Sequence, residues 1–234
     1  MLRAQGEPGR IWRVRLTIGA AVMAAVIGCP IGRPMIAQTD DRSASGAARL
    51  ISGSVPALPS PNAIGWIDEM IELTVDEAGQ VQSVRPLLAA AGTSLVARAV
   101  VDWRFEPAIR GGRAEASHVL VAAIFRPPSV YDNPAAGSPS RTLGAPSPDV
   151  PAPAVTAEPV YPPLAVADAV AIVEVLVGAD GVVRAAHLVD GAPGFEAASL
   201  DAARRWSFRP ARLNGQPISV FAYLVFGFRR PVTR

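Results

Sequence analysis

The chain of 234 residues contains no lysine, a single cysteine and only two histidines. With Cys29 as its one cysteine, the chain cannot form an internal disulfide, and its folded part has no thiol chemistry. All of its basic residues are arginines, scattered among a similar number of acidic residues, and the formal net charge is +2. This balance argues against nucleic-acid binding, which needs a clustered basic surface.

Residues that could carry catalysis or hold a metal are equally scarce. His118 and His187 are expected in strands, with no cysteine beside them and only scattered carboxylates, which does not indicate a metal site. No nucleophile elbow and no phosphate-binding glycine loop is present. Glu72 and Glu174 occupy matching strand positions, and we expect both to face outward rather than to form a catalytic pair. The sequence therefore predicts no catalytic residue, no metal, no cofactor and no enzyme activity.

Residues 1–37 have the pattern of a targeting segment. Arginines precede the apolar stretch 16–32, and Ala37 ends a candidate cleavage site for a secretory signal. Two other outcomes stay open. An uncleaved stretch of this length is at the short limit for a membrane anchor, and residues 26–29 resemble a lipoprotein box with Cys29 as the lipidated residue. Each outcome places the rest of the chain outside the cytoplasm, in the periplasm.

Internal repetition is the most informative feature of the chain. Segment 71–87 is similar to segment 173–189, and segment 101–113 is similar to segment 203–216. A repeat of order, spacing and residue type over this length predicts two copies of one small domain.

The expected domain boundaries follow from the repeat and from composition. The first copy spans residues 48–127 and the second spans residues 160–234. Residues 128–159 between them are dense in proline, alanine and serine. Such a composition cannot build a core and favours an extended linker.

The two copies have the same expected order of elements. Two apolar runs separated by a turn with a late glycine indicate a β-hairpin. A helix follows and ends at Trp-x-Phe-x-Pro, where Trp103 or Trp206 is expected to pack in the core. A last strand covers residues 116–125 or 219–228. The predicted fold class is α+β: two β-β-α-β domains, each a small antiparallel sheet with one helix on a face.

Four short motifs follow one another in the second copy. They are the pair Tyr161–Pro162, an Asp-Gly turn at 180–181, Trp-x-Phe-x-Pro-Ala at 206–211 and Asn-Gly-Gln-Pro at 214–217. In this order they resemble the C-terminal domain of TonB, the energy-transducing protein of the Gram-negative envelope. The first copy keeps Trp-x-Phe-x-Pro-Ala at 103–108 but lacks the Tyr-Pro pair, and we identify it as a degenerate member of the same family.

The resemblance implies partner binding rather than catalysis. In TonB-like proteins the strand after the helix receives an extended peptide of an outer-membrane receptor, the TonB box, in energy-coupled transport. This is strand addition at an open sheet edge, and the strand corresponds here to 219–228. A simpler interpretation is that its side chains are half-buried core. The residues expected to contact the peptide are Tyr161, Pro162, Val220, Phe221, Ala222, Tyr223, Leu224 and Val225.

The chain also departs from a standard TonB. Its N-terminal apolar stretch is short and contains no histidine, and no long Pro-Glu and Pro-Lys spacer precedes the first copy. The inner-membrane motor is a partner only if this segment stays uncleaved, and a homodimer is left open. The alternative hypothesis is a periplasmic structural or adaptor protein whose two copies pack as a pseudo-dimer without energy transduction. The two hypotheses differ in whether the edge at 219–228 is open or paired with the first copy.

Overall fold

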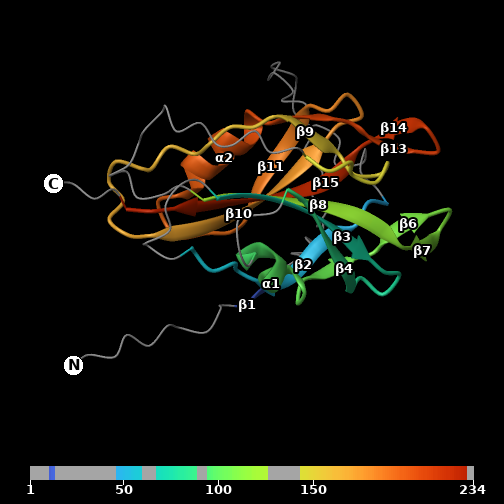
Figure 1. Ribbon diagram of the computed structural model, residues 1–234, viewed down its shortest axis with the longest axis horizontal. Helices are drawn as coiled ribbons and strands as arrows, with labels where there is room; N and C mark the ends of the chain where they lie inside the picture. The colour runs from blue at the N-terminus through green and yellow to red at the C-terminus, as the bar shows by residue number, and fades with distance from the viewer. Residues whose placement is uncertain (1–10, 14–45, 60–66, 89–93, 126–142, 231–234) are drawn as a thin grey trace, which may run out of the picture.

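A single six-stranded sheet runs through the protein (Figure 1). The computed structural model describes residues 11–13, 46–59, 67–88, 94–125 and 143–230. The order of the strands across the sheet is β11-β10-β15-β8-β3-β4, so each half of the chain supplies three neighbouring strands. They are β3 (Ile67–Val75), β4 (Val81–Leu88), β8 (Ser117–Phe125), β10 (Ala169–Val177), β11 (Val183–Asp190) and β15 (Val220–Phe228).

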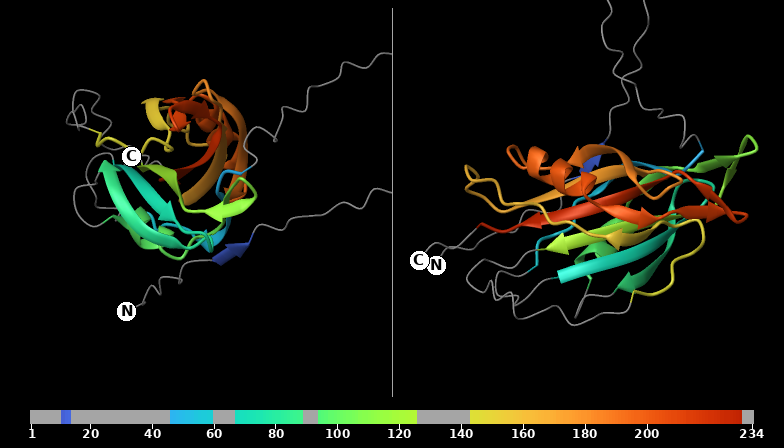
Figure 2. Two further views of the ribbon diagram at one scale, coloured as in Figure 1. Left: turned by 90° about the vertical axis from the view of Figure 1, so that its right-hand side faces the viewer. Right: turned by 90° about the horizontal axis from the view of Figure 1, so that it is seen from above.

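The two halves share this sheet, whereas the sequence predicted two separate ones. Within each half the strands pair antiparallel. Between the halves β15 pairs parallel with β8, from Ala222 opposite Leu120 to Gly227 opposite Phe125. Figure 2 shows the long strands of both halves side by side in one twisted sheet. The alternative hypothesis described such packing of the two halves. Its other claim, that the protein does not transduce energy, is separate, and the packing does not test it.

The order of elements nevertheless repeats, as the sequence predicted. After each hairpin comes one helix, α1 (Leu95–Val100) or α2 (Glu196–Arg204). Three short strands follow it in each half. They are β5 (Arg104–Glu106), β6 (Ala108–Arg110) and β7 (Arg113–Glu115), then β12 (Ser207–Arg209), β13 (Ala211–Leu213) and β14 (Gln216–Ile218).

The short strands were not predicted: neither the three after each helix nor one more before each hairpin. β2 (Arg49–Ser54) pairs with β5, and β9 (Ala152–Val155) pairs with β12. A further strand, β1 (Ile11–Arg13), pairs with β2. The segment before each hairpin therefore belongs to the fold.

The expected linker 128–159 is only partly a linker for this reason. From residue 143 onward the chain is packed onto the sheet, with Val150 buried and β9 bonded to the strand after α2. Proline does not prevent this, because an edge strand tolerates residues without an N–H group. Residues 126–142 lie outside the described residues.

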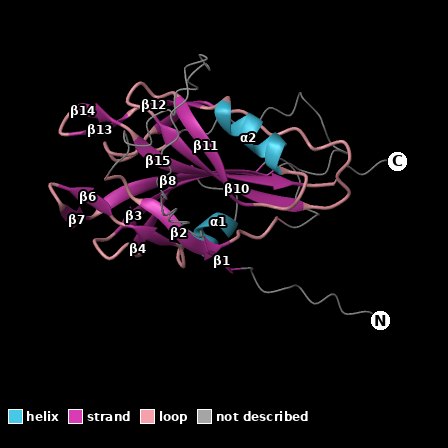
Figure 3. Cartoon of the chain, turned by 180° about the vertical axis from the view of Figure 1, so that it is seen from behind, coloured by secondary structure: helices cyan, strands magenta, loops and turns pink. Residues whose placement is uncertain are grey.

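The two helices cover opposite faces of the sheet (Figure 3). A half-turn about an axis parallel to the strands would bring one half onto the other. This rotation preserves the direction of the strands and exchanges the two faces of the sheet, so the two central strands are parallel and the two helices lie on opposite faces. One core cluster contains Ala202 and Trp206 with Leu224 and Ala122. The other lies on the opposite face, around α1 and Trp103. Both tryptophans are buried, at 0 and 2 % exposure, which confirms their predicted place.

Burial on both faces explains the composition of the central strands. All nine residues of β15 are buried, as are seven of the last eight in β8 and in β10. Strands covered on both faces read as continuous apolar runs rather than alternating ones. The run at 170–177 in the sequence is of this kind.

Each hairpin turn contains a glycine that the fold requires. Gly79 and Gly181 have φ values of +76° and +83°. A Cβ atom at either position would lie 1.8 Å from the carbonyl oxygen of Phe105 or Phe208. The same two phenylalanines donate their N–H groups to the glycine carbonyls at 2.8 Å. The two halves are therefore closed by the same turn-to-strand contact.

No helix within the described residues is long and apolar enough to cross a membrane. The apolar stretch 16–32, on which the three targeting hypotheses depend, lies outside the described residues.

Candidate functional site

The strand expected to receive a partner peptide, β15, does not lie at an edge of the sheet. Along its whole length it pairs antiparallel with β10, and on its other side it pairs parallel with β8. The expectation of an open edge at 219–228 is therefore wrong, because the first half of the chain occupies the second side of this strand.

The side chains of β15 that were expected to contact the peptide are enclosed as well. They alternate between the two core clusters, so both faces of the strand are covered. They can meet a partner only if β8 leaves the sheet, and their environment agrees with the simpler interpretation as core. Their exposures lie between 0 and 8 %: Val220, Phe221, Ala222, Tyr223, Leu224 and Val225.

The Tyr-Pro pair lies on the loop before β10. The hydroxyl of Tyr161 donates to the carbonyl of Ala167 at 2.9 Å, and its ring meets that of Phe195 edge-on at 5.7 Å. Phe195 in turn contacts Phe228, with ring centroids 4.8 Å apart. Tyr161 and Pro162 are both half-buried. The structure thus places the pair at the far end of β15, where it anchors the loop to the start of α2.

The outer edges of the sheet are β4 and β11, and β4 is blocked. Pro86 within it has no N–H group, and the carbonyl of Leu87 accepts a hydrogen bond from the N–H of Gly144 at 2.8 Å. The guanidinium of Arg85 donates to the carbonyl of Ala145 at 3.1 Å. A proline and a covering loop are two of the means by which proteins prevent strand addition at an edge.

The edge at β11 has neither of these protections in the described part of the protein. It contains no proline, and from Val183 to Val189 its backbone makes no hydrogen bond to the backbone of other described residues beyond the ladder with β10. Arg184 and His187 are its exposed side chains, and Arg184 forms an ion pair with Asp180. Ala185 and Ala186 between them are small and half-buried. The structure therefore offers, in the second half, an edge without a proline or a covering segment among the described residues, on a strand that the sequence reasoning did not select.

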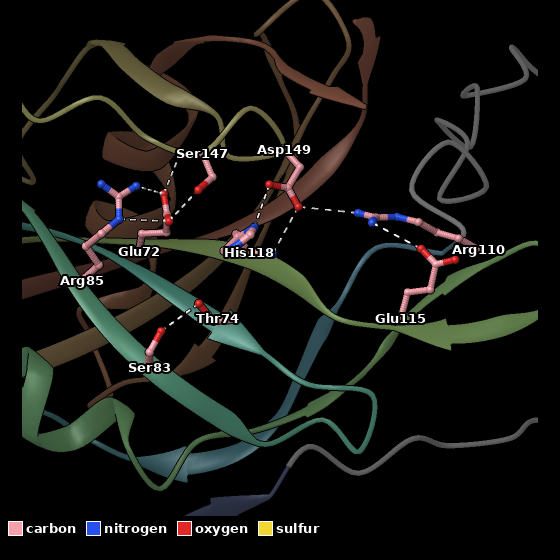
Figure 4. A network of polar contacts seen from close by, with 9 residues as sticks. All are labelled: Glu72, Thr74, Ser83, Arg85, Arg110, Glu115, His118, Ser147 and Asp149. Atoms are coloured by element: carbon pink, nitrogen blue, oxygen red, sulfur yellow. Dashed lines mark hydrogen bonds and ion pairs between the residues drawn. The ribbon is translucent and has the colours of Figure 1, made fainter. Parts of the chain in front are cut away.

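Glu72 is buried, at 4 % exposure, which corrects the expectation that it faces outward. Arg85 pairs with its carboxylate at 2.7 Å, and Ser147 donates to it from both its backbone N–H and its hydroxyl at 2.8 Å (Figure 4). Burial raises the pKa of this carboxyl, but the hydrogen bonds from Ser147 and Arg85 outweigh burial. The pKa of Glu72 is therefore held below its usual value near 4.5.

Glu174, at the matching position in β10, is also buried at 4 % exposure and also does not face outward. The guanidinium of Arg49 donates to it at 2.9 and 3.1 Å. The hydroxyl of Tyr223 donates to it at 3.1 Å and accepts the N–H of Leu50 at 2.6 Å. Burial, together with the negative charge of Glu174, raises the pKa of Tyr223 well above its usual value, so this hydroxyl stays a donor.

These two glutamates connect the halves. Each faces the side of the sheet opposite to its own helix, where the segment entering the other half crosses. Glu72 of the first half thus binds Ser147, which precedes β9, and Glu174 of the second half binds Arg49 in β2. A charged residue at the same place in two strand runs was visible in the sequence. Its partners were not, since Arg49 and Glu174 are separated by 125 positions.

The two histidines have unrelated environments. His118 in β8 contacts Asp149 twice, from its ring Nδ1 at 2.8 Å and its backbone N–H at 3.3 Å (Figure 4). Arg110 lies 3.6 Å from Asp149 and also 3.6 Å from Glu115. His187 is exposed on β11, three strands away. Over the described ranges no three histidine, cysteine or acidic side chains are grouped so that they could hold a metal ion.

Residues 157–229 match the family model described as Gram-negative bacterial TonB protein C-terminal. The match supports the assignment of the second half to this family, whose domains belong to the cell envelope and to transport rather than to catalysis. The first half lies outside the matched residues. No curated protein and no solved structure matches the chain.

Proposed function

We propose that this chain is a TonB-like envelope protein that binds an extended peptide segment of an outer-membrane receptor by strand addition, and that the peptide adds to β11. The family match of residues 157–229 supports the class of partner. The observation that carries the choice of strand is that β11, within the matched half, forms an edge of the sheet that no proline and no described segment blocks.

An extended peptide would use this edge in the ordinary manner of strand addition. Backbone hydrogen bonds to the outward N–H and C=O groups of β11 supply the affinity, and side chains on alternate positions supply selection. Ala185 and Ala186 leave room beside the strand for larger apolar side chains of the peptide. Arg184 and His187, both exposed, flank this region and favour a peptide without basic residues opposite them.

Strand addition at β15 would need a much larger rearrangement. The peptide would have to replace the whole ladder between β15 and β8. Removal of β8 would uncover side chains in both core clusters, because its residues from Val119 to Phe125 are all buried. Addition at β11 needs no existing contact to break, and for this reason we favour it.

Energy coupling is a separate part of the proposal, and it depends on the N-terminal segment 1–37. A retained segment would anchor the protein in the inner membrane, where a motor could act on it. N-terminal sequencing of the mature protein distinguishes the two cases. A start near residue 38 would exclude coupling, whereas an intact start would keep it.

The test is an NMR titration of the ¹⁵N-labelled mature protein with a receptor-derived TonB-box peptide. Saturable shifts in residues 183–189, with none in 81–88, are the expected result. Binding without shifts in β11, or shifts confined to 219–228, would contradict the assignment to this edge. Absence of any binding would contradict the proposed function itself.

Proline substitutions provide a matched control on the two edges. Successive N–H groups of a strand point to opposite sides, so one of Ala185→Pro and Ala186→Pro removes an outward donor from β11. That variant should fold and lose peptide binding. Ser83→Pro and Val84→Pro are the same changes at the matching positions of β4. Folded variants of β4 should bind the peptide as the unmodified protein does.

A further inference from the structure

The first half of the chain contains a strand for which the described part of the second half has no counterpart. β1 pairs antiparallel with β2, with Trp12 opposite Gly53. Together with β5 these strands form a three-stranded sheet, whereas β9 and β12 form a sheet of two strands. Among the described residues, one edge of β9 is therefore without a neighbouring strand.

β2 and β9 are equivalent strands of the two halves. Leu50 lies opposite Phe105 in the first half, and Pro153 lies opposite Phe208 in the second. Both ladders skip one residue of the outer strand before the next pair, so they share the same irregularity at the same place. The residues of β2 can therefore be matched one by one with those of β9.

The two tryptophans extend this match to the residues that pair with β1. The indole N–H of Trp103 donates to the carbonyl of Ser54 at 2.9 Å. In the same way, the indole N–H of Trp206 donates to the carbonyl of Ala157 at 2.7 Å. Residues 52–54, which pair with β1, thus correspond to residues 155–157.

The two segments differ in how far they are covered. Gly53 is buried and Ser52 is half-buried, whereas Thr156 is exposed and Val155 is 55 % exposed. Val160, a little further along the same segment, is 68 % exposed. A ligand on this edge would therefore remove apolar surface from water, which favours binding.

The backbone of this segment has groups that can pair with a ligand. The carbonyl of Ala157 points towards Trp206, and successive carbonyl groups of an extended segment point to opposite sides. The carbonyl and the N–H of Thr156 are therefore turned outward, and neither makes a hydrogen bond to any described residue. The corresponding residue of the first half, Gly53, is the one that lies opposite Trp12 of β1.

We propose that residues 155–157 bind an extended peptide segment of a partner protein, antiparallel and in the register that β1 adopts on residues 52–54. One peptide residue exchanges both main-chain hydrogen bonds with Thr156, and the next one, opposite Val155, is apolar. The first half supports this class of ligand, because an extended segment occupies the matching edge there. The proposal does not rest on strand addition at β11, which belongs to a different sheet.

The probe is a capped pentapeptide, Arg-Ile-Trp-Arg-Val, with the sequence of residues 10–14, which include β1. Titrated into the ¹⁵N-labelled mature protein, it should cause saturable NMR shifts at residues 155–157. A mature protein that begins near residue 38 lacks β1, and shifts at 52–54 then serve as a positive control. Binding without shifts at 155–157, or no binding at all, would overturn the proposal. Neither result would bear on β11, which is tested with a different peptide.

Methylation of the peptide backbone tests the main-chain pairing without any change to the protein. N-methylation at Trp12 removes the N–H group that faces Thr156, and affinity should fall at least about tenfold. N-methylation at Ile11, whose N–H group points away, is the matched control and should leave affinity nearly unchanged. Equal losses for the two methylated peptides would overturn the proposal.

A change of one peptide side chain tests the expected preference for an apolar residue. Arg13 lies opposite Ser52, so in the second half the same position lies opposite Val155. The peptide with Arg13→Val should bind residues 155–157 about two- to fivefold more tightly, since apolar cross-strand pairs are favourable. Weaker binding of this peptide would contradict the proposed preference.

Substitution of Thr156 tests the same contact from the side of the protein. Thr156→Pro removes the outward N–H group and should abolish the shifts at 155–157. Thr156→Val keeps this group and should bind the peptide as the unmodified protein does. A Thr156→Pro variant that keeps its thermal midpoint and still binds at 155–157 would contradict the proposal. Dimerisation without peptide that Thr156→Pro abolishes would instead identify a second copy as the occupant, and would overturn the choice of a partner peptide.

Discussion

The two halves of this protein share a scaffold and differ at their edges. Both have the same hairpin, the same positive-φ glycine and the same tryptophan at the end of the helix. Yet β4 is closed by Pro86 and by residues 144–145, whereas β11 carries alanines and no covering segment among the described residues. Scaffold contacts and edge contacts can therefore change independently within one repeated unit.

The buried glutamates show the same divergence. Glu72 is neutralised by Arg85, its cross-strand neighbour. His187 stands opposite Glu174 in the matching register, and the cation that pairs with Glu174 is Arg49 from the other half. The first half thus satisfies its carboxylate partly within its own hairpin, while the second half depends on β2. The outer strand of the second hairpin, β11, therefore supplies no cation to Glu174, whereas β4 supplies Arg85 to Glu72.

The largest expected effect is that of Glu174→Ala compared with Glu72→Ala. Loss of Glu174 leaves the hydroxyl of the fully buried Tyr223 without its acceptor and removes the ion pair of Arg49, and should lower the free energy of unfolding by about 3 kcal/mol. Loss of Glu72 leaves Arg85, which is half exposed and can return to water, so about 1–2 kcal/mol is expected. Denaturant titration measures both.

The control for this comparison is Glu115→Ala, which removes an exposed carboxylate 3.6 Å from Arg110. A surface pair of this kind contributes about 0.5 kcal/mol or less. Equal losses for Glu72→Ala and Glu174→Ala would show that the halves do not differ in how they depend on one another.

Substitution of the turn glycines should affect the halves equally. Gly79→Ala and Gly181→Ala each place a Cβ atom against a backbone carbonyl, at a φ value that favours glycine. We expect a loss of about 2–4 kcal/mol in each variant by the same denaturant titration. A large loss in one variant alone would contradict the equivalence of the two scaffolds. Gly215→Ala has a positive φ but no atom near its Cβ, and should cost less.

The smallest effect is the acid dependence that Glu72 contributes. Its pKa is lowered on folding, so its stabilisation is complete above the unfolded value near 4.5 and is lost as the pH falls through the folded value. The difference in unfolding free energy between the unmodified protein and Glu72→Gln should therefore shrink as the pH is lowered from 6 towards 3. A difference that is constant over this range would contradict the lowered pKa.

Much of each half could be predicted from the sequence. The hairpins, the helices, the buried tryptophans and the last strands are marked by local patterns of apolar and turn residues, which are visible in the sequence. The short strands β2 and β9, like those that follow each helix, escaped prediction because their segments are short and show no clear periodicity. Residues 143–159 were taken for a linker on composition alone.

The position of the binding strand in the sheet could not be predicted in this way. Val220–Val225 form a strand, as the apolar run indicated, but the run does not say which strands lie on its two sides. Its continuous apolar character was a signal of burial on both faces, since an edge strand more often alternates. The sequence did not distinguish the edge at β11 from the edge at β4. The two edges differ in the segments that lie beside them, which are known only from the folded chain.

By itself, the sequence determined the repeated unit, its order of elements and the family of its second copy, because these follow from local patterns and motifs. Tertiary structure alone decided that the two units share one sheet, with β8 beside β15 and each glutamate bound to the opposite half. The physical reason is that a strand with two apolar faces can pair with many others. The partner is selected by how completely both faces and every buried charge are covered when the whole chain packs.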